Sequence, residues 1–466
     1  MIPRRLPTPC SSSPMTPRCA MHWGSAAGSL SSETWPSGRC WATSSRASMC
    51  SVPAPSDKTI HHILVLEPDT EGHPREWLEH LVAFAAVPQR RLTLSLVVAP
   101  EMGDHLTASL PSGLDGKVRI VALRPYERWL CTRRFLTLAA FARWWVMRRY
   151  LRRTGAQAGH FLSFDHMCLP LALGLGMGGR PVSGILFRPS VHYADWTVGR
   201  ASRGEKLRDL RKVLLYRLTL LNRSVRTVLS LDPYFPDHAR GRYRHGDKVQ
   251  AIPDPAYPQA NESPSTTARS SANHVGFVLF GYLTERKGLL VLLDALSLVD
   301  PVVASRIAIT IAGRIEPALH DRVQERVQRI RAQRPDLVLR LDDRWLPADE
   351  LDALVAGSQV VLAPYQRFVG SSGVLLWAAQ AGLPLLTQDY GLLGRLVRDH
   401  KLGLTTDTMD PASLAASIER MVTTGPHTFV DPVAARSFVR SRTPDAFASA
   451  VVRSLQCGEH AAESAL

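Results

Sequence analysis

The stretch VGFVLFGYLTERKGLLVLLDAL, residues 275–296, decides the fold class, because it joins the signals of a strand, a turn and a helix. Its first seven residues are apolar or glycine, as in a strand whose sheet is covered on both faces. Over residues 287–298 leucines recur at helical spacing, which predicts a helix there. A buried strand that turns into a helix is the repeating unit of a parallel α/β sheet.

The chain after this unit repeats it. Further strands are expected at RIAITIAG, LVLRLDD, QVVLAPY and PLLTQD, and helices are expected through Arg331 and at residues 349–356, 373–380, 392–399, 413–421 and 433–454. This series predicts a Rossmann-like, doubly wound domain over residues 274–466. Its last helix could cross back to the preceding part of the chain.

A second series of the same kind runs over residues 59–255. Its strands are expected at HILVLEP, RLTLSLVVAP, KVRIVALRP, GHFLSFD, VSGILFRP and RTVLSLD. Between the two series, residues 256–273 are rich in Pro, Ser, Thr and Asn and lose all periodicity, as interdomain linkers do. The predicted fold class is therefore α/β, with two Rossmann-like doubly wound domains whose strand ends face a cleft.

Residues 1–58 differ from the rest in composition. They are crowded with Ser, Pro, Arg and Thr and show neither helical nor strand periodicity, which predicts a disordered extension. Arg4 and Arg5 are not followed by the apolar segment of a secretory signal. An out-of-frame stretch upstream of the true start, with Met49 as the initiator, is an alternative interpretation.

The bulk composition favours a soluble, cytoplasmic protein of two large domains. The chain has 466 residues, of which 45% are hydrophobic, and its longest apolar run, residues 167–177, is shorter than the roughly 18 residues that span a bilayer. Seven cysteines without paired spacing indicate neither a disulfide framework nor a metal site. A formal charge of +15 favours phosphate-bearing partners, but no nucleic-acid-binding motif accompanies it, so specific nucleic-acid binding is not expected.

The turn FGYLTERKG, residues 280–288, is the first candidate binding motif. Gly281 permits a tight backbone turn, and Arg286 and Lys287 lie beside a helix N-terminus, where free amides and the helix dipole favour an anion such as a diphosphate. A charged, solvated helix start is an equally consistent interpretation.

A second motif opens the expected helix VLLWAAQAG. It consists of Gly370, Ser371, Ser372 and Gly373. Small residues at a helix start let backbone amides approach a phosphate, and serine hydroxyls add hydrogen bonds. An ordinary N-cap explains the same residues, because serine is a favoured capping residue.

In their order and spacing, these motifs and the strands between them resemble the nucleotide-sugar domain of glycosyltransferase family 4, a family of the GT-B fold. The resemblance covers roughly 180 residues, from FGYLTERKG through GSSGVLLWAAQAG to DYGLLGRLV and KLGL. It implies that Lys287 contacts the donor diphosphate and that residues 370–373 lie beside the phosphates. It also implies a retaining, metal-independent transfer of a sugar from a nucleoside diphosphate, with no cofactor.

Three positions depart from the family pattern. Tyr282 stands where relatives usually carry a phosphate-binding arginine, and Arg286 could substitute for it. The paired glutamates of the family fall on Val369 and Trp377. The second glutamate normally accepts hydrogen bonds from the donor ribose, which a tryptophan side chain cannot do.

The N-terminal series offers candidate residues at the ends of its strands. Gly72 and His73 follow the first strand, in what resembles the family's first loop, where His73 could act on the sugar or the acceptor. Asp165, His166 and His192 follow later strands and are expected at the cleft. For each of these residues taken alone, a structural role is the more common alternative.

Two basic helices are candidates for docking on an anionic membrane. FARWWVMRRYLRRTG interleaves Trp144 and Trp145 with arginines, and SRGEKLRDLRKVLLYRLTLLNR is a second basic segment. A solvated face over an ordinary core is the alternative.

Together these patterns predict an enzyme that moves a hexose-type sugar from a nucleoside diphosphate sugar to a glycan or lipid-linked acceptor. We expect it in the cytoplasm, with peripheral contact to the inner face of the membrane. Val369 and Trp377 also fit a binding or scaffold protein that has lost transfer, and a sugar-nucleotide epimerase is a third alternative.

Overall fold

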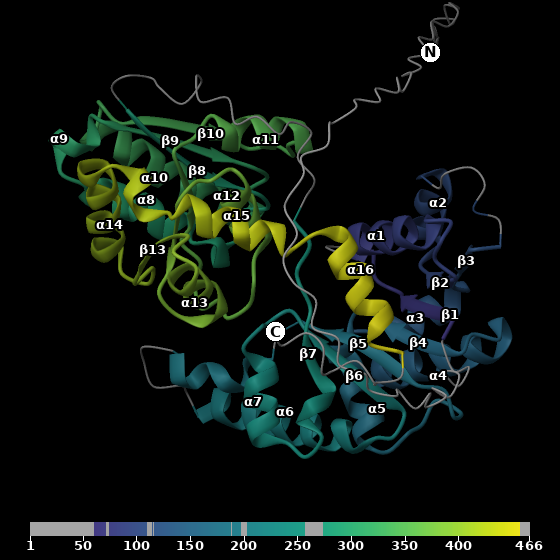
Figure 1. Cartoon of the computed structure of the whole chain (residues 1–466). Coiled ribbons are helices and arrows are strands. Elements are labelled where there is room, and N and C mark those ends of the chain that lie inside the picture. Colours follow the sequence, from purple (N-terminus) through teal and green to yellow (C-terminus); the bar gives the residue numbers. More distant parts are fainter. Residues whose placement is uncertain are drawn as a thin grey trace, which may run out of the picture. The chain divides into compact units, whose positions relative to one another are not determined.

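Two parallel β-sheets organise the chain in the computed structural model (Figure 1), which describes residues 60–70, 74–109, 114, 116–187, 189–196, 203–256 and 274–456. The first sheet has seven strands in the order β3-β2-β1-β4-β5-β6-β7. These strands are β1 (His62–Glu67), β2 (Thr93–Val98), β3 (Val118–Ala122), β4 (Ala158–Phe161), β5 (Val182–Leu186), β6 (Val225–Ser230) and β7 (Val249–Ala251).

The second sheet has six strands in the order β10-β9-β8-β11-β12-β13. They are β8 (Val275–Phe280), β9 (Ile307–Ala312), β10 (Val338–Asp342), β11 (Val360–Ala363), β12 (Leu385–Gln388) and β13 (Gly403–Thr406). In each sheet the strand order reverses beside its first strand, between β1 and β4 and between β8 and β11. Ligands of doubly wound sheets bind at such switch points, outside the carboxyl ends of the strands. The predicted α/β class with two Rossmann-like domains is confirmed.

Helices connect the strands of the first sheet. They are α1 (Pro74–Ala86), α2 (Pro100–Ser109), α3 (Pro125–Cys131), α4 (Leu136–Thr154), α5 (Cys168–Ala172), α6 (Arg203–Leu221) and α7 (Phe235–Arg242). One core cluster of this domain joins α4, α5 and α6 to the sheet, and another joins α1 and α2 to it.

The second sheet is covered in the same way. Its helices are α8 (Leu289–Leu298), α9 (Pro301–Ala304), α10 (His320–Gln333), α11 (Ala348–Ala356), α12 (Gly373–Gln380), α13 (Gly391–Asp399) and α14 (Pro411–Thr424). Leucines of α8 pack into one core cluster and residues of α12 and α13 into another. The helix expected over residues 287–298 begins two residues later, because Gly288 has φ +76°, outside the helical region.

The C-terminal segment is two helices where the pattern predicted one over residues 433–454. They are α15 (Pro432–Arg440) and α16 (Pro444–Arg453). Pro444 lacks the amide that a continuous helix needs, and the Thr443 side chain caps the new helix at the Ala446 amide.

Helix α16 packs against α1 of the first domain, and Figure 1 shows this yellow helix beside it. The Phe447 and Trp77 rings lie 5.1 Å apart, and both side chains are buried. The end of the chain thus belongs to the core of the first sheet. The expected extension, residues 1–58, and the expected linker, apart from Ala256, lie outside the described residues, so these boundaries stay predictions.

Candidate functional site

A chain of hydrogen bonds joins the two motifs at the carboxyl ends of β8 and β11. The Lys287 ammonium group donates to the Tyr365 hydroxyl oxygen at 2.9 Å, and that oxygen lies 2.9 Å from Ser372 Oγ. The Tyr365 side chain is buried, and its hydroxyl group holds both partners in place. Lys287 and Ser372, which are 85 positions apart in the sequence, therefore contact the same hydroxyl group.

Two glycines set the path of the turn that carries Lys287. Gly281 has φ +101°, and the position of a Cβ there lies 3.6 Å from Lys287 Nζ. Gly288 has φ +76°, and a Cβ there would lie 1.8 Å from the Pro364 carbonyl oxygen. The turn after β8 thus packs directly on the loop after β11, and only glycine permits that approach.

The second motif is the N-terminus of α12. Ser372 is the N-cap, and its Oγ accepts a hydrogen bond from the Val374 amide at 3.4 Å. The Leu375 amide donates to the Ser372 carbonyl oxygen at 3.0 Å, and the amides before it belong to the turn in which a helix leaves N–H groups without an acceptor of its own. Gly370 is buried, Ser371 is half-buried and Gly373 is the first helical residue. The capping interpretation is therefore correct, and it leaves the predicted phosphate contact compatible with the geometry.

Ser371 and Ser372 line a cavity of about 200 Å³. Its other walls come from the segments that follow β6 and β7, including Pro253 and Asp254, and from Arg442 between α15 and α16. Burial lowers the pKa of the Arg442 guanidinium to about 10. A cation, serine hydroxyls and apolar walls thus surround one space beside the helix start.

Arg286 is exposed and lies beside the same loop. Its guanidinium carbon is 4.7 Å from the centre of the Phe368 ring, a cation–π distance, and its carbonyl oxygen accepts from the Gln366 amide. Tyr282, where relatives usually carry arginine, is also exposed. Arg286 thus places a second positively charged side chain at the turn that carries Lys287.

The two positions at which the family carries glutamates lie in apolar surroundings. Trp377 packs edge-on against Phe280, with ring centres 6.1 Å apart. Val369 is half-buried and packs against the same core cluster. Neither side chain can accept a hydrogen bond from a ribose.

The candidates of the first domain meet different outcomes. Gly72 and His73 lie outside the described residues. Asp165 accepts a hydrogen bond from the Phe187 amide at 2.8 Å, and burial raises its pKa. Burial and then the charge of Arg143 lower the pKa of His166. Asp165 thus anchors the segment after β5. The predicted contacts of Asp165 and His166 with a substrate stay predictions.

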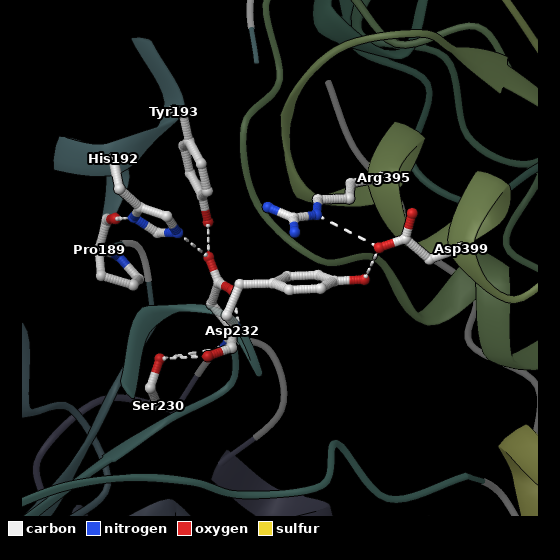
Figure 2. Close-up of polar contacts among 8 residues, drawn as sticks. Pro189, His192, Tyr193, Ser230, Asp232, Arg395 and Asp399 are labelled. Atoms are coloured by element: carbon white, nitrogen blue, oxygen red, sulfur yellow. Dashed lines mark hydrogen bonds and ion pairs between the residues drawn. The ribbon is translucent and has the colours of Figure 1, made fainter. Parts of the chain in front are cut away.

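His192 lies in a buried polar cluster, which Figure 2 shows. Its Nδ1 is 2.7 Å from the Pro189 carbonyl oxygen, and its Nε2 is 2.9 Å from Asp232 Oδ2. The Tyr193 hydroxyl donates to the same carboxylate oxygen at 2.6 Å. Asp232 follows β6 and is fully buried, so it holds both side chains of the segment after β5.

The Asp232 cluster continues to the second domain. Asp232 Oδ1 accepts from the Tyr234 amide, and the Tyr234 hydroxyl donates to Asp399 on α13 at 2.7 Å. The Arg395 guanidinium, which also contacts Asp399, lies 3.8 Å from the centre of the Tyr234 ring. His192 is therefore part of a network that links the strand ends of the first domain to α13, and its predicted contact with a substrate stays a prediction.

Glu67 is a buried titratable residue that the sequence analysis did not single out. It ends β1 and is fully buried, and burial, followed by the charge of Asp69, raises its pKa to about 8. Its Oε1 accepts from the Asp69 amide, and its Oε2 has no hydrogen-bond partner among the described residues. The sequence does hold a signal for Glu67, because this glutamate directly follows four apolar residues of a strand. Burying an unpaired charge there would cost free energy.

Beside Glu67, an open groove of about 820 Å³ lies at the ends of β1 and β2 and the start of α3. Asp69, Thr70, Glu101, Arg128 and Trp129 are among its lining residues. The Arg143 guanidinium holds both oxygens of Asp69, at 3.0 and 2.8 Å. Trp129 is 54% exposed. The Arg133 guanidinium carbon lies 3.3 Å from the centre of this ring, so the groove combines carboxylates and a cation with an aromatic ring that has one face covered.

The two basic helices differ in what they expose. On α4, Val146 and Tyr150 are buried, and the Trp144 indole donates to the Gly176 carbonyl, so much of its apolar side belongs to the core. Trp145 is 39% exposed. On α6, several leucines face outward. None of the helices that the structure describes is long and apolar enough to cross a membrane.

Comparisons with known proteins agree with this geometry. Residues 274–424 match the family model described as "Glycosyl transferases group 1", which confirms the resemblance over that segment. A comparison with curated protein sequences found no match.

Solved structures of similar fold include WaaG, a glycosyltransferase involved in lipopolysaccharide biosynthesis, at 13% identity and a TM-score of 0.57, over 85% of this chain and 100% of that one. Anabaena HepE in complex with UDP has 14% identity and a TM-score of 0.58, over 85% and 99%. Sucrose-phosphate synthase from Thermosynechococcus elongatus has 15% identity and a TM-score of 0.60, over 84% and 98%. At these identities the likeness establishes the fold.

Proposed function

We propose, starting from the match of residues 274–424 to the glycosyl transferases group 1 family, that this chain transfers a sugar from a nucleoside diphosphate to an acceptor. The observation that carries the proposal is the placement of Lys287 and the start of α12 on either side of the Tyr365 hydroxyl. A cation and a helix N-terminus that converge at one point are suited to bind a diphosphate.

Lys287 and α12 have complementary roles in this proposal. When the bond between the sugar and the diphosphate breaks, negative charge develops on the leaving phosphate. The Lys287 ammonium group and the first amides of α12 stabilise that charge, and Arg286 adds a second cation from the same turn. Fixed donors of this kind cost no reorganisation during the reaction, which makes them effective catalysts. We propose a retaining reaction of a hexose-type donor without a cofactor, as the family resemblance implies.

The acceptor is proposed to lie in the groove beside β1. Sugar rings stack on exposed aromatic side chains, and their hydroxyl groups hydrogen-bond to fixed carboxylates and cations. Trp129, Asp69 and Arg128 offer these groups in one groove. A glycan or a lipid-linked sugar fits this chemistry, and synthesis of a polysaccharide is the process that would use it.

A second candidate function is a binding or scaffold protein of the same fold. Trp377 favours it, because this side chain packs against Phe280 and cannot hold a ribose. Such a protein would bind the nucleotide without turning over the sugar.

Calorimetry with UDP, GDP, ADP and their glucose conjugates tests the donor site. The Lys287→Ala variant should bind the preferred nucleotide roughly ten to a hundred times more weakly than the wild type, because it loses a charge-assisted hydrogen bond to phosphate. Arg331→Ala, at an exposed position of α10, removes the same charge elsewhere and should leave the affinity unchanged. Equal affinities of Lys287→Ala and the wild type would contradict the proposed diphosphate position.

Release of the nucleoside diphosphate from its sugar conjugate separates the candidate functions. Binding together with release supports the transferase, and binding without release under any acceptor supports the scaffold. Conversion of the sugar nucleotide with no acceptor present would instead support an epimerase. A chain that binds none of these nucleotides would contradict all three.

A further inference from the structure

Helix α6 carries a stripe of leucines that faces outward. The stripe comprises Leu207, Leu210, Leu214, Leu218 and Leu221. Their exposed fractions run from 37% at Leu218 to 70% at Leu207. The intervals of three and four residues place all five on one face of the helix. Contiguous apolar faces of this kind on a protein surface usually mark an interaction site.

The opposite face of α6 already serves the core of the first domain. Tyr216 and Leu220 are buried in the cluster that covers the sheet, and the buried Thr219 hydroxyl donates to the Cys168 carbonyl at 2.9 Å. The leucine stripe is therefore additional to the face that the fold requires. Helix α6, teal in Figure 1, thus has one apolar face in the core and a second apolar face that is exposed.

Arginines border the stripe. Every exposed charged side chain that the structure describes from residue 203 to residue 223 is an arginine: Arg208, Arg211, Arg217 and Arg223. Helical spacing puts Arg211 on one side of the stripe and Arg217 on the other. Their long apolar stems can lie along a hydrocarbon surface while the guanidinium groups reach its charged border.

From this arrangement we propose that the leucine stripe of α6 docks on the surface of an anionic phospholipid bilayer. The helix lies in the plane of the interface, the leucines enter the boundary of the acyl chains, and the arginines contact the phosphate groups. The arginines beside the leucines argue against a second copy of the chain as the docking partner, because a two-fold contact would bring arginines of both copies together. The proposal rests on the exposed face of α6 and is independent of the proposed reaction.

Flotation with vesicles tests the docking. The wild type should bind vesicles of phosphatidylcholine and phosphatidylglycerol much more tightly than vesicles of phosphatidylcholine alone. The double variant Leu210→Ser/Leu214→Ser should bind the anionic vesicles at least roughly tenfold more weakly, because two leucine insertions are lost. The variant Arg211→Gln/Arg217→Gln should lose most of the preference for anionic lipid and of the sensitivity to salt.

A matched control changes two exposed apolar residues of the second domain, Leu298→Ser/Val302→Ser, and should bind like the wild type. Circular dichroism checks that each variant is folded, and the replaced residues are exposed, so folding should survive. Equal vesicle binding by the wild type and Leu210→Ser/Leu214→Ser would overturn the proposal. So would a wild-type dimer, in analytical ultracentrifugation, that this variant makes monomeric while neither protein binds vesicles.

Discussion

Glu67 is a buried carboxyl group whose pKa is raised to about 8, first by burial and then by the charge of Asp69. In the unfolded chain its pKa lies near the ordinary 4.5. Below that pH both states hold the proton, and the contribution of Glu67 to stability is fully present. Between the two values only the unfolded state loses the proton, so the free energy of unfolding falls as pH rises, by up to about 1.4 kcal/mol per pH unit.

The Glu67→Gln variant tests this pH dependence. Glutamine keeps the oxygen that accepts from the Asp69 amide and does not titrate. The free energy of unfolding of the wild type, minus that of Glu67→Gln, should fall between pH 5 and pH 8 and stay level above that. Urea denaturation of both proteins at several pH values measures it. Parallel pH curves would show that Glu67 does not hold its proton in the folded state.

At the scale of single residues, the sequence pointed to Lys287 and Ser372 but not to what joins them. Both lie in turns with recognisable glycines beside a helix start, so local pattern was enough. Tyr365 lies 78 positions from Lys287, at the end of the expected strand QVVLAPY. A contact of that kind depends on how two βα units pack, which no local pattern reports. Glu67 was missed for a similar reason, since its burial follows from the helices that cover β1.

Gly288 shows how one element positions the site. A Cβ at this residue would meet the Pro364 carbonyl oxygen, and the φ of +76° strains any other L residue. Gly288→Ala should therefore lower the free energy of unfolding by more than about 1 kcal/mol and also weaken nucleotide binding, because the turn that carries Lys287 must move.

Gly276→Ala is the matched control for that variant. A Cβ at Gly276, in β8, would have no heavy-atom neighbour closer than 3.7 Å, so this variant should be about as stable as the wild type. Guanidinium denaturation and calorimetry with UDP compare the two. If Gly288→Ala matched Gly276→Ala in both measurements, the close approach of the two loops would not matter for the site.

At the scale of elements, periodicity predicted the central strands and most helices, and it failed for two edge strands. β7 and β13 lie at the edges of their sheets and were not expected, whereas β4, β11 and β12, of four residues each and inside their sheets, were expected. The two edge strands are only partly buried, so their residues show a weaker apolar pattern than those of a central strand. Pro444 explains the break between α15 and α16. Because proline is favoured at the first position of a helix, it could have predicted the start of α16.

At the scale of the molecule, the chain builds one doubly wound sheet, then a second, and returns to the first through α16. The sequence analysis gave this return to the first domain only as one possibility. The pattern of a helix shows which face is apolar, but it does not show against which domain that face packs. The Asp232 cluster, with Tyr234 and Asp399, adds a polar link to the second domain at the level of side chains. Both domains thus contribute groups near the cavity beside Ser371 and Ser372.

A crystal structure of the chain with its preferred nucleoside diphosphate is the most direct test of the account. The account predicts the diphosphate within about 3 Å of Lys287 Nζ and of the backbone amides at the start of α12. A diphosphate bound elsewhere, with Lys287 still held only by Tyr365, would contradict it.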